Sequence, residues 1–146
     1  MVPKHILVPV DSMAASTAAL DYAIELAKKL DARVTVLHAY IIPVIGFPDG
    51  ALVATAEMAT TIMNAAQAAM GDLMEERKAC GVKLTPMLHQ DDARDAILQV
   101  AADVSADLII MGTHGRRGFS RALLGSVAEM VLRRADVPVL VLRKPE

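Results

Sequence analysis

The 146-residue sequence has little cysteine, few aromatic side chains and no excess of basic residues. Its single cysteine, Cys80, cannot form an internal disulfide and has no metal-ligand spacing around it, so a reducing compartment is expected. Aromatic residues make up 3% of the chain and tryptophan is absent, while the net charge is −2 and the sequence pI is about 6.1. Nucleic-acid binding is therefore not expected, because bases lack rings to stack on and phosphates lack a basic surface.

Long apolar segments are also missing from the sequence. Only a short apolar run precedes Asp11, too short for the core of a signal peptide. No stretch approaches the ~18 apolar residues that a membrane span requires. We therefore expect a cytoplasmic protein without a membrane span, with residues 1–146 forming a single domain large enough to need no disulfide or structural metal.

Short apolar runs alternate with segments of helical periodicity along the chain. Strands are expected at residues 5–10, 33–39, 82–89, 107–111 and 137–143, and helices at residues 13–30, 52–80, 92–105 and 126–135. Gly81 is expected to cap the second helix, and Asp91 or Asp92 to cap the third. Five strands interleaved with four helices predict an α/β fold with a mostly parallel sheet.

The most informative segment is DLIIMGTHGRRGFSRALLGS, residues 107–126, in which an apolar strand leads into a glycine-spaced loop and then into a helix. Gly112 and Gly115 alone are typical of an ordinary turn at a strand end. A second pair, Gly125 and Ser126, follows after nine residues at the start of a helix, which no turn requires. The combination predicts a phosphate cradle built from main-chain N–H groups.

Two residue types in this segment have competing interpretations. Ser126 with Glu129 matches a capping box, which would use the helix-start donors structurally. Because the Glu129 carboxylate would repel a phosphate, we expect it to be turned away or bound locally. Arg116 and its neighbours Arg117 and Arg121 either offset phosphate charge or remain solvated.

Asp11 follows the first strand, where it either accepts from ribose hydroxyls, holds Mg²⁺ through water, or caps the first helix. Sequence spacing does not give the strand order. If the first and fourth strands are neighbours, Pro9, Val10 and Asp11 face the Gly112 loop across one crevice.

Known catalytic patterns are absent from the sequence. It contains no P-loop lysine motif, no G-x-G-x-x-G after a strand and no nucleophile elbow around Ser126. The four histidines lack the spacing of a metal site. The last strand, VPVLVLR, is a candidate sheet edge through which a homodimer is expected.

The chain resembles the universal stress protein family, specifically its ATP-binding branch, over essentially its whole length. The resemblance rests on ILVPVDSMAAS, on RVTVLHAY and on ADLIIMGTHGRRGFSRALLGSVAEMVLRRADVPVLVL, which matches the family pattern G-x-x-G, nine residues, G-[ST]. It implies an open, Rossmann-like five-stranded parallel sheet in the order 3-2-1-4-5, with helices on both faces. It also implies a stress-response role, cytoplasmic location, dimers paired through the last strand and, at most, weak ATP hydrolysis.

The resemblance also implies residue roles. Gly112, Gly115, Gly125 and Ser126 are expected to hold phosphates, Val127 to add a backbone contact and Asp11 to serve ribose or metal. The residues expected to line an adenine pocket are Pro9, Val10, Ala39 and Met111, with Ala39 reading the base through its main chain.

Three hypotheses follow for the function. The leading one is a regulatory module that binds ATP with Mg²⁺ and is read by an unidentified protein partner. The alternatives are a slow ATPase or adenylate-transferring enzyme, and an interaction protein with an unoccupied pocket.

Overall fold

The structure, a computed structural model, describes residues 1–11, 14–50, 52–53, 56–113 and 124–143. Its main sheet contains β1 (His5–Pro9), β2 (Arg33–Tyr40), β5 (Leu84–Gln90), β6 (Leu108–Thr113) and β7 (Val139–Arg143). Its helices are α1 (Ala14–Leu30), α2 (Ala56–Glu76), α3 (Ala93–Asp103) and α4 (Ser126–Arg134). Two short strands, β3 (Ile45–Gly46) and β4 (Leu52–Val53), pair antiparallel in a separate hairpin.

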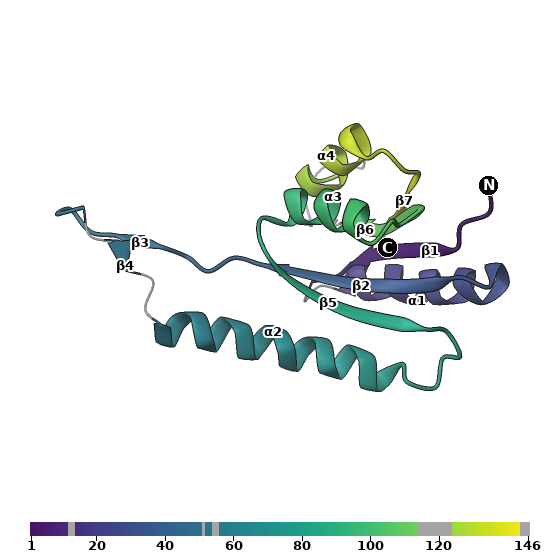
Figure 1. The fold of residues 1–146 in the computed structure, drawn as a ribbon, viewed down its shortest axis with the longest axis horizontal. Coiled ribbons are helices and arrows are strands. Elements are labelled where there is room, and N and C mark those ends of the chain that lie inside the picture. The colour runs from purple at the N-terminus through teal and green to yellow at the C-terminus, as the bar shows by residue number, and fades with distance from the viewer. Residues whose placement is uncertain (12–13, 51, 54–55, 114–123, 144–146) are drawn as a thin grey trace.

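The main sheet is parallel throughout and has the strand order β5-β2-β1-β6-β7 (Figure 1). Counting only the strands of this sheet, the order is 3-2-1-4-5, which confirms the expected α/β fold. The chain moves outward from β1 to β2 and β5, then returns to the other side of β1 for β6 and β7. The reversal therefore lies between β1 and β6.

Both faces of the sheet are covered by apolar side chains, because alternate strand residues point to opposite faces. On one face Ile6 and Val8 of β1 pack with Leu20 and Ile24 of α1. On the other face Leu7 clusters with residues of α3 and α4, all of them nearly fully buried: Ile97, Val100, Ala128 and Val131. Because β1 is buried on both faces, it appears in the sequence as a continuous apolar run.

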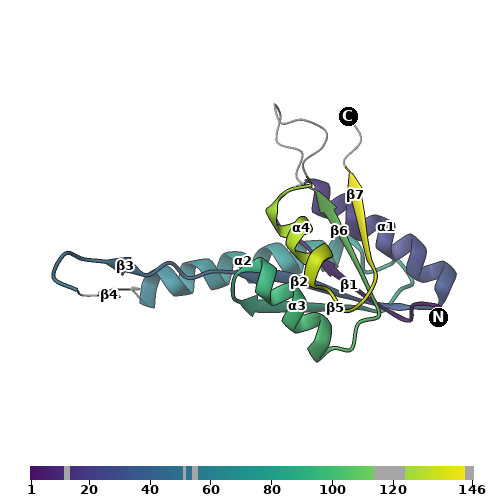
Figure 2. The same cartoon turned by 90° about the horizontal axis from the view of Figure 1, so that it is seen from above.

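The segment between β2 and β5 differs from the prediction. A helix was expected at residues 52–80, whereas α2 begins at Ala56 and ends at Glu76. The expected loop before it contains the β3–β4 hairpin, whose turn is closed by the Gly50 N–H donating to the Phe47 carbonyl at 2.9 Å. Gly50 has φ +84°, a conformation that suits glycine. The hairpin and the start of α2 extend well beyond the sheet (Figures 1 and 2).

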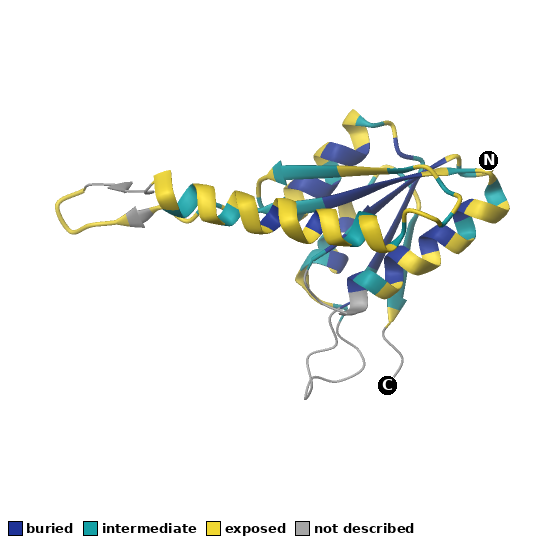
Figure 3. Cartoon of the chain, turned by 90° about the horizontal axis from the view of Figure 1, so that it is seen from below, coloured by how far each residue is buried: buried dark blue, intermediate teal, exposed yellow. Residues whose placement is uncertain are grey.

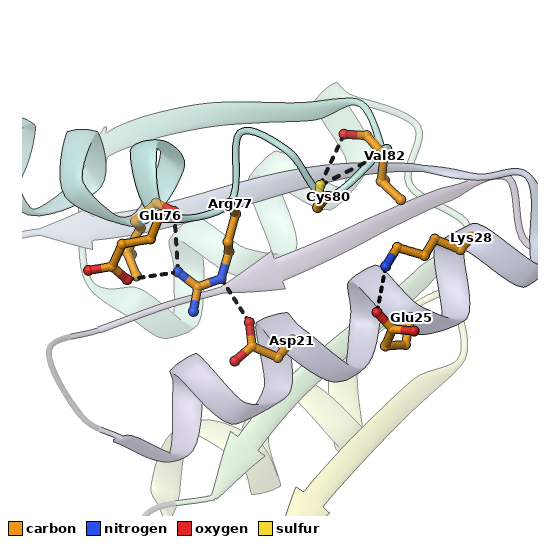
Figure 4. A network of polar contacts seen from close by, with 8 residues as sticks. Asp21, Glu25, Lys28, Glu76, Arg77, Cys80 and Val82 are labelled. Atoms are coloured by element: carbon orange, nitrogen blue, oxygen red, sulfur yellow. Dashed lines mark hydrogen bonds and ion pairs between the residues drawn. The ribbon is translucent and has the colours of Figure 1, made fainter.

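The end of α2 is fixed by side chains as well as by its backbone (Figure 4). The Arg77 side chain is one-tenth exposed, and its Nε donates to Asp21 Oδ1 of α1 at 2.8 Å. Arg77 Nη1 donates to the carbonyl of Leu73 at 3.2 Å. Gly81, with φ +80°, lies in the turn that follows rather than capping the helix directly, so that expectation is wrong.

The expected cap of α3, Asp91 or Asp92, is confirmed for Asp92. Asp92 is the N-cap, and its Oδ1 accepts from the Arg94 N–H at 3.0 Å. The helix therefore begins at Ala93 rather than at residue 92.

The starts of β1 and β6 are tied together by one carboxylate. Asp107 Oδ1 accepts from the main-chain N–H groups of Lys4 at 3.1 Å and His5 at 3.0 Å. His5 itself is buried, and its Nε2 lies 2.7 Å from Thr35 Oγ1 of β2. Burial, reinforced by the nearby Arg33 charge, lowers the pKa of His5.

This lowered pKa predicts that acid weakens the fold. The unfolded chain binds the proton of His5 more readily than the folded chain, so the free energy of unfolding falls as the pH drops below about 6.5. Urea denaturation over a series of pH values measures this slope, with His5→Gln as the variant that cannot titrate. We expect a flatter pH dependence in His5→Gln, and equal slopes in the two proteins would contradict the assignment to His5.

Candidate functional site

The candidate site lies where the strand order reverses. Strand β1 pairs with β2 along its whole length, up to Pro9 beside Leu37, but with β6 only at Ile6 and Leu7. Strand β6 continues to pair with β7 as far as Thr113. Beyond Leu7 the ladder between β1 and β6 has ended, so each strand follows its outer neighbour (Figure 2). Ligands of open α/β sheets bind at such a point, outside the carboxyl ends of the strands.

The end of β1 is anchored to β2 by two hydrogen bonds. The Val10 N–H donates to the Leu37 carbonyl at 2.7 Å. His38 Nδ1 lies 3.1 Å from the Val10 carbonyl. Because a carbonyl only accepts, His38 Nδ1 is the donor in this contact. This positioning role of His38 was not predicted, because the sequence analysis considered the spacing of the histidines only as a sign of a metal site.

Asp11 is half-buried and is held in place by α1. Its main-chain N–H donates to Ser16 Oγ at 3.0 Å, and the same hydroxyl lies 2.9 Å from Asp11 Oδ1. Ser16 is only 5% exposed, so the contact is shielded from water. The alternative that Asp11 caps a helix start concerns the N–H groups two and three residues after it, and residue 13 lies outside the described residues. Ser16 was missed by the sequence analysis because no motif marked it.

Six predicted site residues lie at the carboxyl ends of three adjacent strands. Val10 and Met111 are buried, with 6% and 4% exposure. Pro9, Ala39 and Gly112 are half-buried, as is Asp11. The structure therefore brings the expected adenine-pocket residues together around the split between β1 and β6. Gly115 and Arg116 lie outside the described residues.

The start of α4 lies on the same side of the sheet as Met111. Met111 belongs to one apolar cluster with Ala128, and Val127 packs against that cluster. The N-cap of α4 is Gly125, which is exposed and has φ +84°, and no heavy atom of the described residues lies within 4 Å of the place a Cβ would take. Among the described residues, no side chain caps the start of this helix. Helix-start N–H groups with no such partner are suited to an anion.

The capping-box interpretation of Ser126 is wrong. Ser126 is the first helical residue, and Gly125, which has no side chain, takes the N-cap position. Glu129 is engaged elsewhere, because its Oε1 accepts from Arg133 Nη2 at 2.8 Å. The expectation that this carboxylate is bound locally is confirmed, and the Ser126 hydroxyl is left exposed beside the helix start.

Within the described part of the chain, no group of three or more His, Cys, Asp and Glu side chains is placed to hold a metal ion. A magnesium ion at this site fits only if Asp11 is joined by phosphate oxygens and water, a ligand set common for Mg²⁺. No helix in the described part of the chain has the length and apolar character needed to cross a bilayer.

Comparison with known proteins agrees with this architecture. The model of the universal stress protein family matches residues 3–143. Universal stress protein MJ0531 of Methanocaldococcus jannaschii is 34% identical over 145 residues, which cover 98% of this chain and 84% of that protein. The structure of universal stress protein UspA from Lactobacillus plantarum superposes with a TM-score of 0.80 at 23% identity, covering 96% of this chain and 97% of the other.

Two further structures of similar fold are named as nucleotide complexes. One is a universal stress protein in complex with cAMP (TM-score 0.72, 24% identity, 98% of both chains). The other is an Arabidopsis thaliana family member with AMP bound (TM-score 0.70, 17% identity, 98% of this chain and 93% of that one). These structural similarities support the fold, and the family model and the M. jannaschii relative show the family. The chain belongs to the universal stress protein family.

Proposed function

We propose that this chain binds ATP with Mg²⁺ between the carboxyl ends of β1 and β6 and acts as a regulatory module whose bound state a protein partner reads in the cytoplasm. The observation that carries the proposal is the end of the β1–β6 ladder beside a helix that starts at an exposed glycine without a side-chain cap. The complexes of family members with cAMP and AMP support an adenine nucleotide as the ligand class.

In this proposal the carboxyl ends of β1, β2 and β6 bind the adenine base. Pro9, Val10 and Met111 contact the adenine, and the main chain of Ala39 reads its edge. Val10 and Met111 are buried, so the base would pack against apolar residues that the fold already holds in place. Asp11, oriented by Ser16, contacts the ribose or holds Mg²⁺ through water.

The phosphates are assigned to the glycine loop and to the start of α4. Gly112, Gly115, Gly125 and Ser126 donate to phosphate oxygens, Val127 adds its main-chain N–H, and Arg116 offsets charge. An anion at one helix start gains at most about 2 kcal/mol. Micromolar affinity requires about 8 kcal/mol, so several main-chain donors and burial of the base must act together.

We also propose that a second copy of the chain pairs with β7. The sheet has two edge strands, β5 and β7. Pro86 lies in the middle of β5, beside Val36 of β2, and proline lacks the N–H that a new strand would need. Strand β7 contains no proline, so its free edge offers an uninterrupted row of backbone donors and acceptors.

The first prediction concerns the glycine loop. Gly115→Val is expected to weaken ATP binding at least tenfold, about 1.4 kcal/mol, because the side chain would crowd the triphosphate. Isothermal titration calorimetry measures the affinity. The matched control is Gly71→Val on α2, where a Cβ meets nothing within 4 Å. Unchanged affinity in Gly115→Val would remove the loop from the site.

A second prediction separates binding from folding at Ser126. Because Ser126 is exposed and is not the N-cap of α4, Ser126→Ala should change the free energy of unfolding by no more than about 0.5 kcal/mol in urea denaturation. The same variant should bind ATP more weakly than the native chain. A stability loss of about 1 kcal/mol without a change in affinity would restore the structural interpretation.

The third prediction tests the β7 dimer by amide hydrogen exchange. Amides of β7 that point away from β6 should exchange slowly at high protein concentration and faster on dilution. The outward amides of β5 are the internal control and should exchange at a rate independent of concentration. Equal, concentration-independent exchange at both edges would rule out pairing through β7.

A further inference from the structure

A long projection leaves the sheet at the end of β2 (Figure 1). We call residues 41–50, the strands β3 and β4, and residues 56–65 of α2 the arm. The buried residues of α2, Ala66 and Met70, and the core-packed Leu73 and Met74 all lie beyond the arm. The first ten residues of α2 therefore extend about 15 Å past the part of the helix that packs on the sheet.

Most of the arm is exposed (Figure 3), and its exposed residues include large apolar ones. Ile41 is 58% exposed, Val44 59%, Phe47 50% and Met63 40%. An isolated two-stranded hairpin is at best marginally stable in water. Apolar exposure of this kind on a thin projection indicates a surface that is covered in the working protein.

The charge of the arm restricts what covers it. Residues 41–65 contain no Lys, Arg or His, and their only charged residues are Asp49 and Glu57. Anionic lipid and nucleic acid both require basic side chains, which this segment lacks. An apolar surface poor in charge is typical of the core of interfaces between identical chains.

The arm also carries both halves of a complementary contact. A hollow of about 330 Å³ lies at the start of α2, lined by Glu57, Met58, Thr61 and Ile62. Phe47 lies at the hairpin tip, where the hydrogen bond from the Gly50 N–H to its carbonyl fixes the turn. A two-fold contact requires that each copy supply both partners of every contact, and the arm has an exposed ring as well as a hollow.

We propose that the arm packs against the arm of a second copy of this chain, with Phe47 of each copy entering the α2 hollow of the other. This contact is separate from the pairing of β7 and does not depend on nucleotide binding. The chain thus has two surfaces for its own copies, one apolar and one made of backbone groups.

The lack of tryptophan provides a direct test. Phe47→Trp places the only indole of the chain at the arm tip, and its emission should shift to shorter wavelength as protein concentration rises. Tyr22→Trp, on the 45% exposed site of α1, is the control and should show no concentration dependence. Adding Ile62→Asp to Phe47→Trp should abolish the shift.

Light scattering after size exclusion gives the second measurement. The double variant Val44→Asp, Ile62→Asp should halve the molar mass of the native protein, whether or not β7 also pairs, with an unchanged far-UV circular dichroism spectrum. Exchange of the β7 amides reports the other contact independently.

Three results would overturn the proposal. They are a concentration-independent emission from Phe47→Trp, a shift of that emission caused only by lipid vesicles, and a native molar mass retained by the folded double variant.

Discussion

Strand β1 is the constraint on which the rest of the molecule depends. It pairs with β2 on one side and with β6 on the other, and its side chains are buried on both faces. The Asp107 carboxylate fixes its start by accepting from two main-chain N–H groups. Strand β1 stays paired with β2 along its whole length, whereas its pairing with β6 is confined to Ile6 and Leu7, next to that tied end. The opening of the sheet at the candidate site thus follows from how β1 is held at its other end.

Strands β1, β2 and β6 were predictable because buried parallel strands appear in the sequence as apolar runs, and the less buried edge strands β5 and β7 were recognised as well. The hairpin at β3 and β4 was missed because two-residue strands have no detectable alternation, and Pro43 and Pro48 indicated only irregular structure. The start of α2 was placed too early because Leu52 and Val53 fit a helical apolar pattern equally well. Local sequence cannot distinguish these cases, since the difference depends on pairing with residues several positions away.

The site residues divide in the same way. Glycines at a strand end and a helix start have few other uses, so Gly112 and Gly125 were recognisable from spacing. His38 and Ser16 were not, because each acts through one hydrogen bond to a neighbouring segment that only folding brings close. For Ser126 and Glu129, by contrast, the spacing indicated a role that the structure does not show. Their spacing fits a cap, but Gly125 takes the N-cap position and Arg133 engages the carboxylate.

The junction between β2 and the projecting hairpin has a mechanical consequence. Ala39 belongs to the site, Tyr40 is the last residue of the strand, and the Tyr40 carbonyl accepts from the Asp91 N–H at 3.0 Å. That hydrogen bond fixes the end of β2 to the residue that follows β5. Because the hairpin projects far from the sheet, a small change of angle at this strand end would displace the hairpin tip by a much larger distance. The base of the projection and Ala39 of the candidate site therefore share the carboxyl end of one strand.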